Sequence, residues 1–223
     1  MQAPKVISIT TGIFLLAAFL LYGGGQSMIS GLINQSLTPD SLWDHRTTFA
    51  IGALFMLMNS FIVVGIGILL FPVLEHYCKR TALLYLSTRM VEAVFLAIST
   101  LCLLLIVFAG KTARENPEAA SIFQTLADYS LNGNFISYQI GMLTLGIGSL
   151  FFCYALFKFR LVPRWLSIWG IAGYAVLAFG CAAELFGLEI GVLLSAPGGL
   201  FEVIFAIWLI VKGFRLPSPL SKG

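Results

Sequence analysis

The stretch LLYLSTRMVEAVFLAISTLC, residues 83–102, is apolar and long enough to cross a lipid bilayer. A membrane helix needs about 20 predominantly apolar residues to span the hydrocarbon layer. Two ionisable side chains, Arg89 and Glu92, nevertheless lie well inside this stretch. A charge at the centre of a membrane helix costs about 2.5–3.5 kcal/mol on insertion scales. We therefore expect both side chains to face the protein interior rather than lipid.

The composition of the whole chain agrees with this interpretation. Of the 223 residues, 59% are hydrophobic and 10% are charged, whereas soluble domains carry about 25% charged residues. So few charges cannot cover a surface that faces water, which indicates an integral membrane protein. No basic stripe with interleaved aromatic residues is present, so no nucleic-acid partner is predicted.

The sequence predicts an all-α membrane bundle, with one domain over residues 1–223. The first apolar run is longer than that of a signal peptide and more spans follow it, so it is predicted to be a transmembrane helix. We expect Gly23–Gly25 to end this helix, and FGLEIG (186–191) with Pro197–Gly198 to form a tight turn. The six predicted spans cover about residues 7–28, 49–72, 82–109, 135–157, 164–186 and 194–212.

The distribution of lysine and arginine predicts the orientation of the bundle. If the N-terminus is cytoplasmic, three of these residues fall in outer loops, namely Arg46, Lys111 and Arg114. Positive residues are enriched in cytoplasmic loops, so both termini are predicted to be cytoplasmic. The residues then expected on the inner side are Lys5, Lys79, Arg80, Lys158, Arg160, Arg164, Lys212, Arg215 and Lys222.

The longest outer loop, residues 110–134, is predicted to contain a short amphipathic helix. Asn116 is a suitable N-cap and Pro117 a suitable first residue. The sequence Asn132–Gly133 is expected to end the helix. The apolar residues of one face are Ile122, Phe123, Leu126 and Tyr129. We expect this helix to lie on the outer leaflet; the alternative is a lid over a site.

Five of the six predicted spans place a polar side chain at a similar depth, counted at about 1.5 Å per residue from the flanking basic or proline residues. These side chains form the predicted ligand-binding layer, and they are Arg89, Glu92, Glu202, Asn59, Tyr174 and Ser149. Arg89 and Glu92 are three residues apart on one helix face and can pair. The sharpest prediction is a buried cluster of Arg89, Glu92 and Glu202.

Three functional hypotheses remain open at this point. In the first, the polar layer binds or passes a small ligand, a lipid or an ion. In the second, the protein is a non-catalytic scaffold and the charges hold helices in register, or Arg89 extends toward the inner surface. In the third, it is a lipid-modifying enzyme.

The enzyme hypothesis has the least support, because no nucleophile–base pair is recognisable. We predict no catalytic residue, no metal site and no cofactor, since His45 and His76 lie in separate loops and the four cysteines have no metal-ligand spacing. Membrane lipids are the expected partners. Gly141, Gly146 and Gly148 permit close helix contacts within or between protomers, so a homo-oligomer is compatible with the sequence.

Three motifs resemble a bacterial multi-pass membrane family, domain of unknown function 4386. They are TRMVEAVFL (88–96), FKFRLVPRWLSIWGIAGY (157–174) and APGGLFEVIFAIWLIVKG (196–213). The resemblance covers nearly the whole chain and implies a small helical protein of the bacterial inner membrane, but no reaction. The residues that match the polar and proline positions of the family are Arg89, Glu92, Pro163, Pro197 and Glu202.

Overall fold

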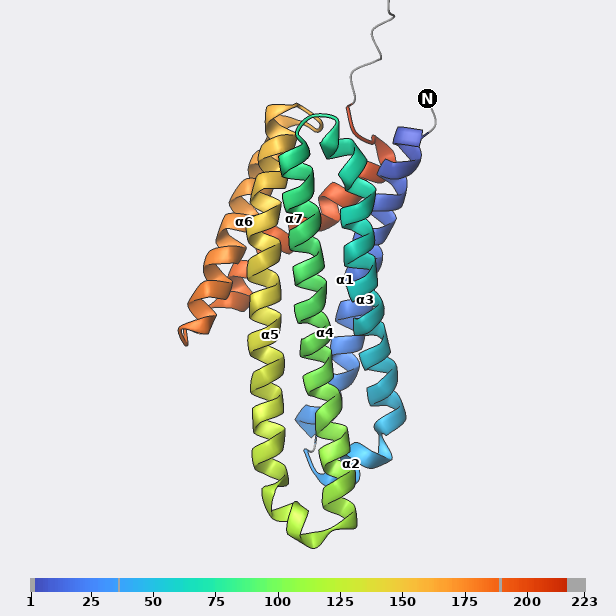
Figure 1. The fold of residues 1–223 in the computed structure, drawn as a ribbon, viewed down its shortest axis with the longest axis vertical. Coiled ribbons are helices and arrows are strands. Elements are labelled where there is room, and N and C mark those ends of the chain that lie inside the picture. The colour runs from blue at the N-terminus through green and yellow to red at the C-terminus, as the bar shows by residue number, and fades with distance from the viewer. Residues whose placement is uncertain (1–2, 36, 189, 216–223) are drawn as a thin grey trace, which may run out of the picture. The chain divides into compact units, whose positions relative to one another are not determined.

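The computed structural model describes residues 3–35, 37–188 and 190–215 (Figure 1). Within this part of the chain every regular element is a helix. The helices are α1 (Ala3–Gln35), α2 (Pro39–Asp44), α3 (Arg46–Glu75), α4 (Lys79–Glu115), α5 (Pro117–Lys158), α6 (Arg164–Leu185) and α7 (Gly191–Val211).

Six of these helices are long and apolar enough to cross a membrane: α1, α3, α4, α5, α6 and α7. The predicted all-α bundle with six transmembrane helices is therefore confirmed. The side on which the termini lie stays a prediction. Lys222, which that prediction used, and Glu189 of the predicted turn lie outside the described residues.

The first helix does not end at Gly23–Gly25 as predicted, but continues to Gln35. Packing explains the difference. A Cβ atom on Gly25 would collide with the carbonyl oxygen of Gly52, and one on Gly52 would lie 2.9 Å from the carbonyl oxygen of Gly25. The glycines thus allow α1 and α3 to approach closely, a common role of small residues in membrane helices.

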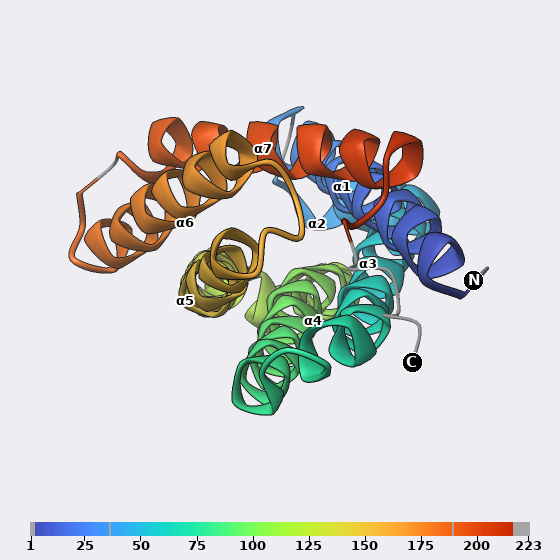
Figure 2. The ribbon, with the colours of Figure 1, turned by 90° about the horizontal axis from the view of Figure 1, so that it is seen from above.

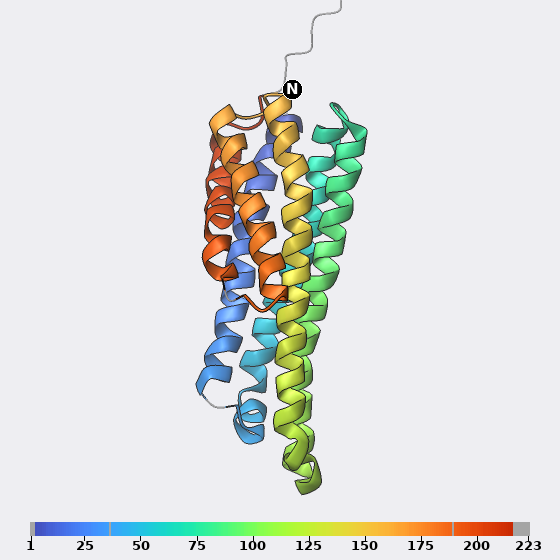
Figure 3. The same cartoon turned by 90° about the vertical axis from the view of Figure 1, so that its left-hand side faces the viewer.

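The segment 110–134 is helical, but it does not form a separate helix on the membrane surface. Asn116 caps the start of α5 as predicted, because its Oδ1 atom accepts a hydrogen bond of 3.0 Å from the backbone N–H of Glu118. The helix then runs unbroken through Asn132–Gly133 beside α4 (Figure 3). An added Cβ on Gly133 would lie 3.1 Å from the Cys102 sulfur, so this glycine serves helix contact rather than helix termination.

The predicted turn before the last span is only partly correct. Helix α6 ends at Leu185, and Gly187 has a φ of 83°, a conformation that favours glycine. Pro197, however, lies inside α7. Helices α6 and α7 pack side by side (Figure 2), and a Cβ on Gly173 would lie 3.1 Å from the Cα atom of Gly198. The Pro–Gly pair therefore belongs to a helix contact.

The contacts divide the chain into two compact units. Unit 1 comprises residues 1–16, 64–90 and 142–223, and unit 2 comprises residues 17–63 and 91–141. The long helices α1, α3, α4 and α5 each contribute to both. The core of unit 2 is aliphatic and aromatic and includes Ile29, Leu42, Phe49, Met56, Leu103, Ile106 and Phe123. Unit 1 contains the residues from which the candidate site is built.

Candidate functional site in unit 1

Arg89 is held inside unit 1 by a residue one helical turn before it. Its side chain is 3% exposed, and its Nε atom donates a hydrogen bond of 2.9 Å to the hydroxyl of Tyr85. The guanidinium carbon also lies 5.1 Å from the centre of the Tyr85 ring. Gly67 of α3 makes room for the stem, because a Cβ there would lie 3.1 Å from the Arg89 Cβ. Burial and this contact argue against an Arg89 that extends to the membrane surface.

A second polar pair joins α6 to α7. The hydroxyl of Tyr174 donates a hydrogen bond of 2.6 Å to Oε1 of Glu202. This distance is typical of a hydroxyl that donates to an ionised carboxylate. Tyr174 is 3% exposed, whereas Glu202 is half-buried. The neighbouring contact between Gly173 and Gly198 brings the two helices close enough for this bond.

A continuous series of aromatic rings connects the two polar pairs. Tyr85 stacks on Phe152 at 4.6 Å between ring centres, and Phe152 lies 5.8 Å from Phe205. Phe205 stacks on Phe201 at 5.4 Å, and Phe201 meets Tyr174 edge-on at 5.6 Å. All five rings are buried. We call these five rings, which form a continuous path of contacts from Tyr85 to Tyr174, the aromatic wall.

The two charges lie in the same compact unit. Cys153, which is fully buried in α5, lies in that unit as well. Charges interact more strongly in a region of low dielectric constant than in water. A change of charge at Glu202 should therefore be felt first by Tyr174 of α6, which donates a hydrogen bond to it.

Ser149 adds a hydrogen-bonding group one turn before Cys153 on α5. Its side chain is completely buried, and its Oγ atom has no hydrogen-bond partner among the described residues. Buried hydroxyl groups usually have a partner. Helix geometry places Ser149 on the same face of α5 as Cys153, because the two residues are four apart. Ser149 is thus the least satisfied polar group of the layer.

The structure brings some predicted site residues together and leaves others to be tested. Arg89, Tyr174, Ser149 and Glu202 all lie in unit 1, and Tyr174 contacts Glu202 directly. The other two predicted residues, Glu92 and Asn59, are 2% and 4% exposed and lie in unit 2. The proposed cluster of Arg89, Glu92 and Glu202 stays a prediction.

The sequence analysis missed Tyr85, Cys153 and the three phenylalanines of the aromatic wall. Tyr85 was recognisable in principle, because it lies four residues before Arg89 and therefore on the same helix face. The phenylalanines carried no such signal, since phenylalanine is frequent in all the spans. Among the described residues, no group of three or more His, Cys, Asp or Glu side chains is arranged to hold a metal ion.

The comparison with family models gave one result that covers most of the chain. The model described as "Domain of unknown function (DUF4386)" matches residues 10–213. Searches of curated proteins and of solved structures gave no match. The matched segment contains every residue of the polar layer. The chain therefore belongs to the family of the domain of unknown function DUF4386.

Proposed function

We propose that this integral membrane protein binds a small ligand or an ion through the polar layer of unit 1, with Glu202 as the main binding group. The observation that supports the proposal most directly is the incomplete hydrogen bonding and partial exposure of this carboxylate. Its Oε1 atom accepts one hydrogen bond, from Tyr174, and the side chain is only half-buried. Tyr174 is the hydrogen-bond partner of Glu202 among the described residues.

The chemistry of a carboxylate inside a membrane helix supports a binding role. Ionisable residues in membrane spans are expensive, and they typically mark the paths or sites of ions and substrates. An ionised carboxylate has acceptor capacity on both oxygens, so Glu202 can accept further hydrogen bonds or approach a cation. Arg89 supplies positive charge to the same layer, and Ser149 supplies a buried hydroxyl. The layer can therefore hold a cation, a proton or a small polar molecule.

The test compares Glu202→Gln with the wild-type protein in detergent micelles. The probes are sodium chloride, potassium chloride and choline chloride at equal ionic strength, and the readout is the thermal unfolding midpoint. At least one cation is expected to raise the midpoint of the wild type but not of Glu202→Gln. Glu118→Gln, a change at an exposed carboxylate in the first turn of α5, is the control. Equal shifts in all three proteins would contradict the proposal.

The aromatic wall favours a second candidate function, that of a non-catalytic scaffold. Its five rings pack against one another from Tyr85 to Tyr174, as expected of groups that hold helices in register. Replacing a buried ion pair by apolar residues of similar volume is often neutral or stabilising. If the charges are purely structural, the triple variant Arg89→Leu, Glu92→Leu and Glu202→Leu should fold with unchanged or higher stability and show no cation response.

We also propose that the protein resides in a bacterial plasma membrane with both termini in the cytoplasm. Support comes from the excess of lysine and arginine in one set of loops and from the family resemblance. Cys78 offers a test, because it lies between α3 and α4. A hydrogen bond from the Thr81 side chain lowers the pKa of the Cys78 thiol, which increases the reactive thiolate fraction.

A membrane-impermeant maleimide should therefore leave Cys78 unlabelled in intact cells and label it after lysis. The matched variant is Thr47→Cys combined with Cys78→Ser, because Thr47 is exposed near the start of α3. We expect this variant to react in intact cells. Labelling of Cys78 but not of Thr47→Cys from outside would reverse the proposed orientation.

A further inference from the structure

One end of unit 1 carries a set of cations from two chain segments that contain no carboxylate. Residues 154–170 and 203–215 contain no aspartate or glutamate. The five basic residues in these two segments are all exposed, and they are Lys158, Arg160, Arg164, Lys212 and Arg215. We call them the basic group. The nearby Glu75 pairs with another residue, Lys79, and a positive group of this kind attracts anions.

The fold draws the two segments together. After α5 the chain turns at Arg160, which has the left-handed φ of 55°, and Leu161 is then fully buried. The backbone N–H of Arg215 donates a hydrogen bond of 2.8 Å to the carbonyl oxygen of Leu161. The segment that follows α7 is thereby tied to the α5–α6 connection, so that cations from both segments lie at the same end of unit 1.

Tryptophan side chains lie beside the basic group. The guanidinium carbon of Arg215 is 5.9 Å from the centre of the Trp208 ring, and Trp165 meets Trp208 edge-on at 6.5 Å. The Nε1 atom of Trp208 is buried and has no hydrogen-bond partner among the described residues. The N–H is buried, so it is the ring face of Trp208 that contacts the cation of Arg215.

The surface next to these groups is apolar. Trp165 and Ile168 of α6 are 54% and 55% exposed, and Ile207 and Val211 of α7 are 50% and 66% exposed. All four residues belong to helices that can cross a membrane. A ligand that contacts both the basic group and this surface must combine a negative headgroup with hydrocarbon. A free phosphate ion has no hydrocarbon part with which to contact the apolar side chains.

We propose that the basic group, together with Trp208, binds the headgroup of an anionic phospholipid, whose acyl chains lie along the exposed apolar residues of α6 and α7. The site is separate from the polar layer, and the proposal does not depend on the function proposed there. Basic residues at a membrane boundary bind anionic lipids at roughly 1 kcal/mol each, which corresponds to about a fivefold change in affinity per residue.

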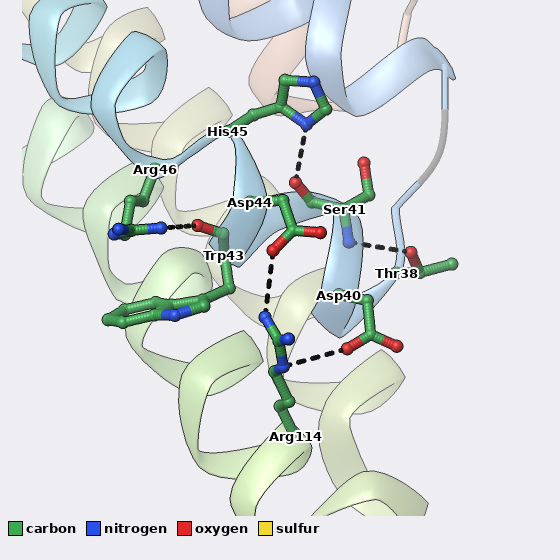
Figure 4. A network of polar contacts seen from close by, with 8 residues as sticks. All are labelled: Thr38, Asp40, Ser41, Trp43, Asp44, His45, Arg46 and Arg114. Atoms are coloured by element: carbon green, nitrogen blue, oxygen red, sulfur yellow. Dashed lines mark hydrogen bonds and ion pairs between the residues drawn. The ribbon is translucent and has the colours of Figure 1, made fainter.

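Trp43 in unit 2 provides a natural contrast. Arg46 and Lys111 lie 4.9 Å and 5.3 Å from the centre of its ring, so it also contacts two cations. Two acidic residues lie near this ring, because Asp40 and Asp44 belong to the same short helix α2 as Trp43 (Figure 4). The protein itself supplies the negative charge in that region, and no lipid headgroup is needed.

The test measures binding of dioleoylphosphatidylglycerol to the full-length protein in mixed micelles by tryptophan fluorescence, with dioleoylphosphatidylcholine as the neutral comparison. We expect selective binding of the anionic lipid. The double variant Arg164→Gln and Arg215→Gln should weaken it roughly 30-fold. The matched control, Arg46→Gln with Lys111→Gln, removes the two cations beside Trp43 and should change the affinity less than twofold.

Two further variants keep the test decisive if the double variant unfolds. Arg164→Lys with Arg215→Lys retains the charges and should bind nearly as well as the wild type. Trp208→Phe retains an aromatic ring but weakens the cation–π contact that positions Arg215, and should bind about twofold more weakly. Equal binding of both lipids, an equal effect of the control variant, or full competition by 10 mM inorganic phosphate would overturn the proposal, the last in favour of a free anion.

Discussion

Two sets of charged residues differ in their environment: Arg89 and Glu202 in unit 1, and Arg114 with its acidic partners in unit 2. In unit 1, Arg89 and Glu202 each use a tyrosine hydroxyl as a hydrogen-bond partner, within helices that can span a membrane. In unit 2, Arg114 forms direct ion pairs, 3.0 Å from Asp44 and 3.3 Å from Asp40 (Figure 4). The first arrangement is buried or half-buried, and the second is exposed.

This difference shows how environment decides the energetic weight of a charge. Exposed ion pairs contribute about 0–1 kcal/mol, because water and salt screen them. A buried charge has lost its hydration, so its remaining partners matter far more. Arg89 and Arg114 should therefore respond very differently to substitution.

The largest effect is expected for Arg89→Met. This change keeps an apolar stem of similar length but removes the buried cation and its hydrogen bond to Tyr85. Removing one member of a buried charged group costs about 3–5 kcal/mol. The free energy of unfolding, measured by SDS titration in mixed micelles with circular dichroism, should fall by that amount. A decrease in the unfolding free energy of less than about 1 kcal/mol would show that Arg89 contributes no more to stability than an exposed charge.

Tyr174→Phe should have the next largest effect. It removes the hydroxyl that donates to Glu202 while it keeps the ring that packs on Phe201. A hydrogen bond to a charged group contributes about 1.5–3 kcal/mol, and the unfolding free energy should decrease accordingly. Tyr154→Phe is the control, because Tyr154 is 57% exposed. Similar losses in both variants would show that the Tyr174 hydroxyl has no special role.

A pair of glycine substitutions sharpens the comparison at the level of packing. In Gly67→Ala the new Cβ would lie 3.1 Å from the Cβ of Arg89, so we expect a loss of about 1 kcal/mol from overpacking. In Gly31→Ala nothing lies within 4 Å of the new atom. Alanine favours a helix by about 0.5–1 kcal/mol over glycine, so this variant should be stabilised. Opposite signs in the same unfolding assay are the expected result.

The smallest effect is expected for Arg114→Gln. Its two ion pairs are exposed, so the unfolding free energy should change by less than about 1 kcal/mol. Raising the salt concentration to 1 M should abolish even this difference, because salt screens exposed charges. The effect of Arg89→Met should persist at high salt. A loss for Arg114→Gln as large as that for Arg89→Met would erase the distinction between the two units.

The sequence predicted where membrane helices form better than it predicted where they end or contact one another. The six membrane spans were predictable, because each follows from a continuous apolar run. The helix ends were less so: Gly23–Gly25, Asn132–Gly133 and Pro197–Gly198 are typical of turns, yet all lie within helices. At each site a glycine contacts a neighbouring helix, or lies beside one that does. A sequence pattern cannot distinguish a glycine that ends a helix from one that permits a contact.

The sequence by itself determined that this chain crosses a membrane with six helices, and that Arg89, Glu92 and Glu202 are too costly to face lipid. It did so because hydrophobic length and the cost of a charge in hydrocarbon are properties of local segments. Only the tertiary structure decided that Tyr85 is a partner of Arg89, that Tyr174 binds Glu202 and that three phenylalanine rings connect the two tyrosines. Those contacts depend on which helix faces meet, and side-chain packing between distant segments fixes that choice.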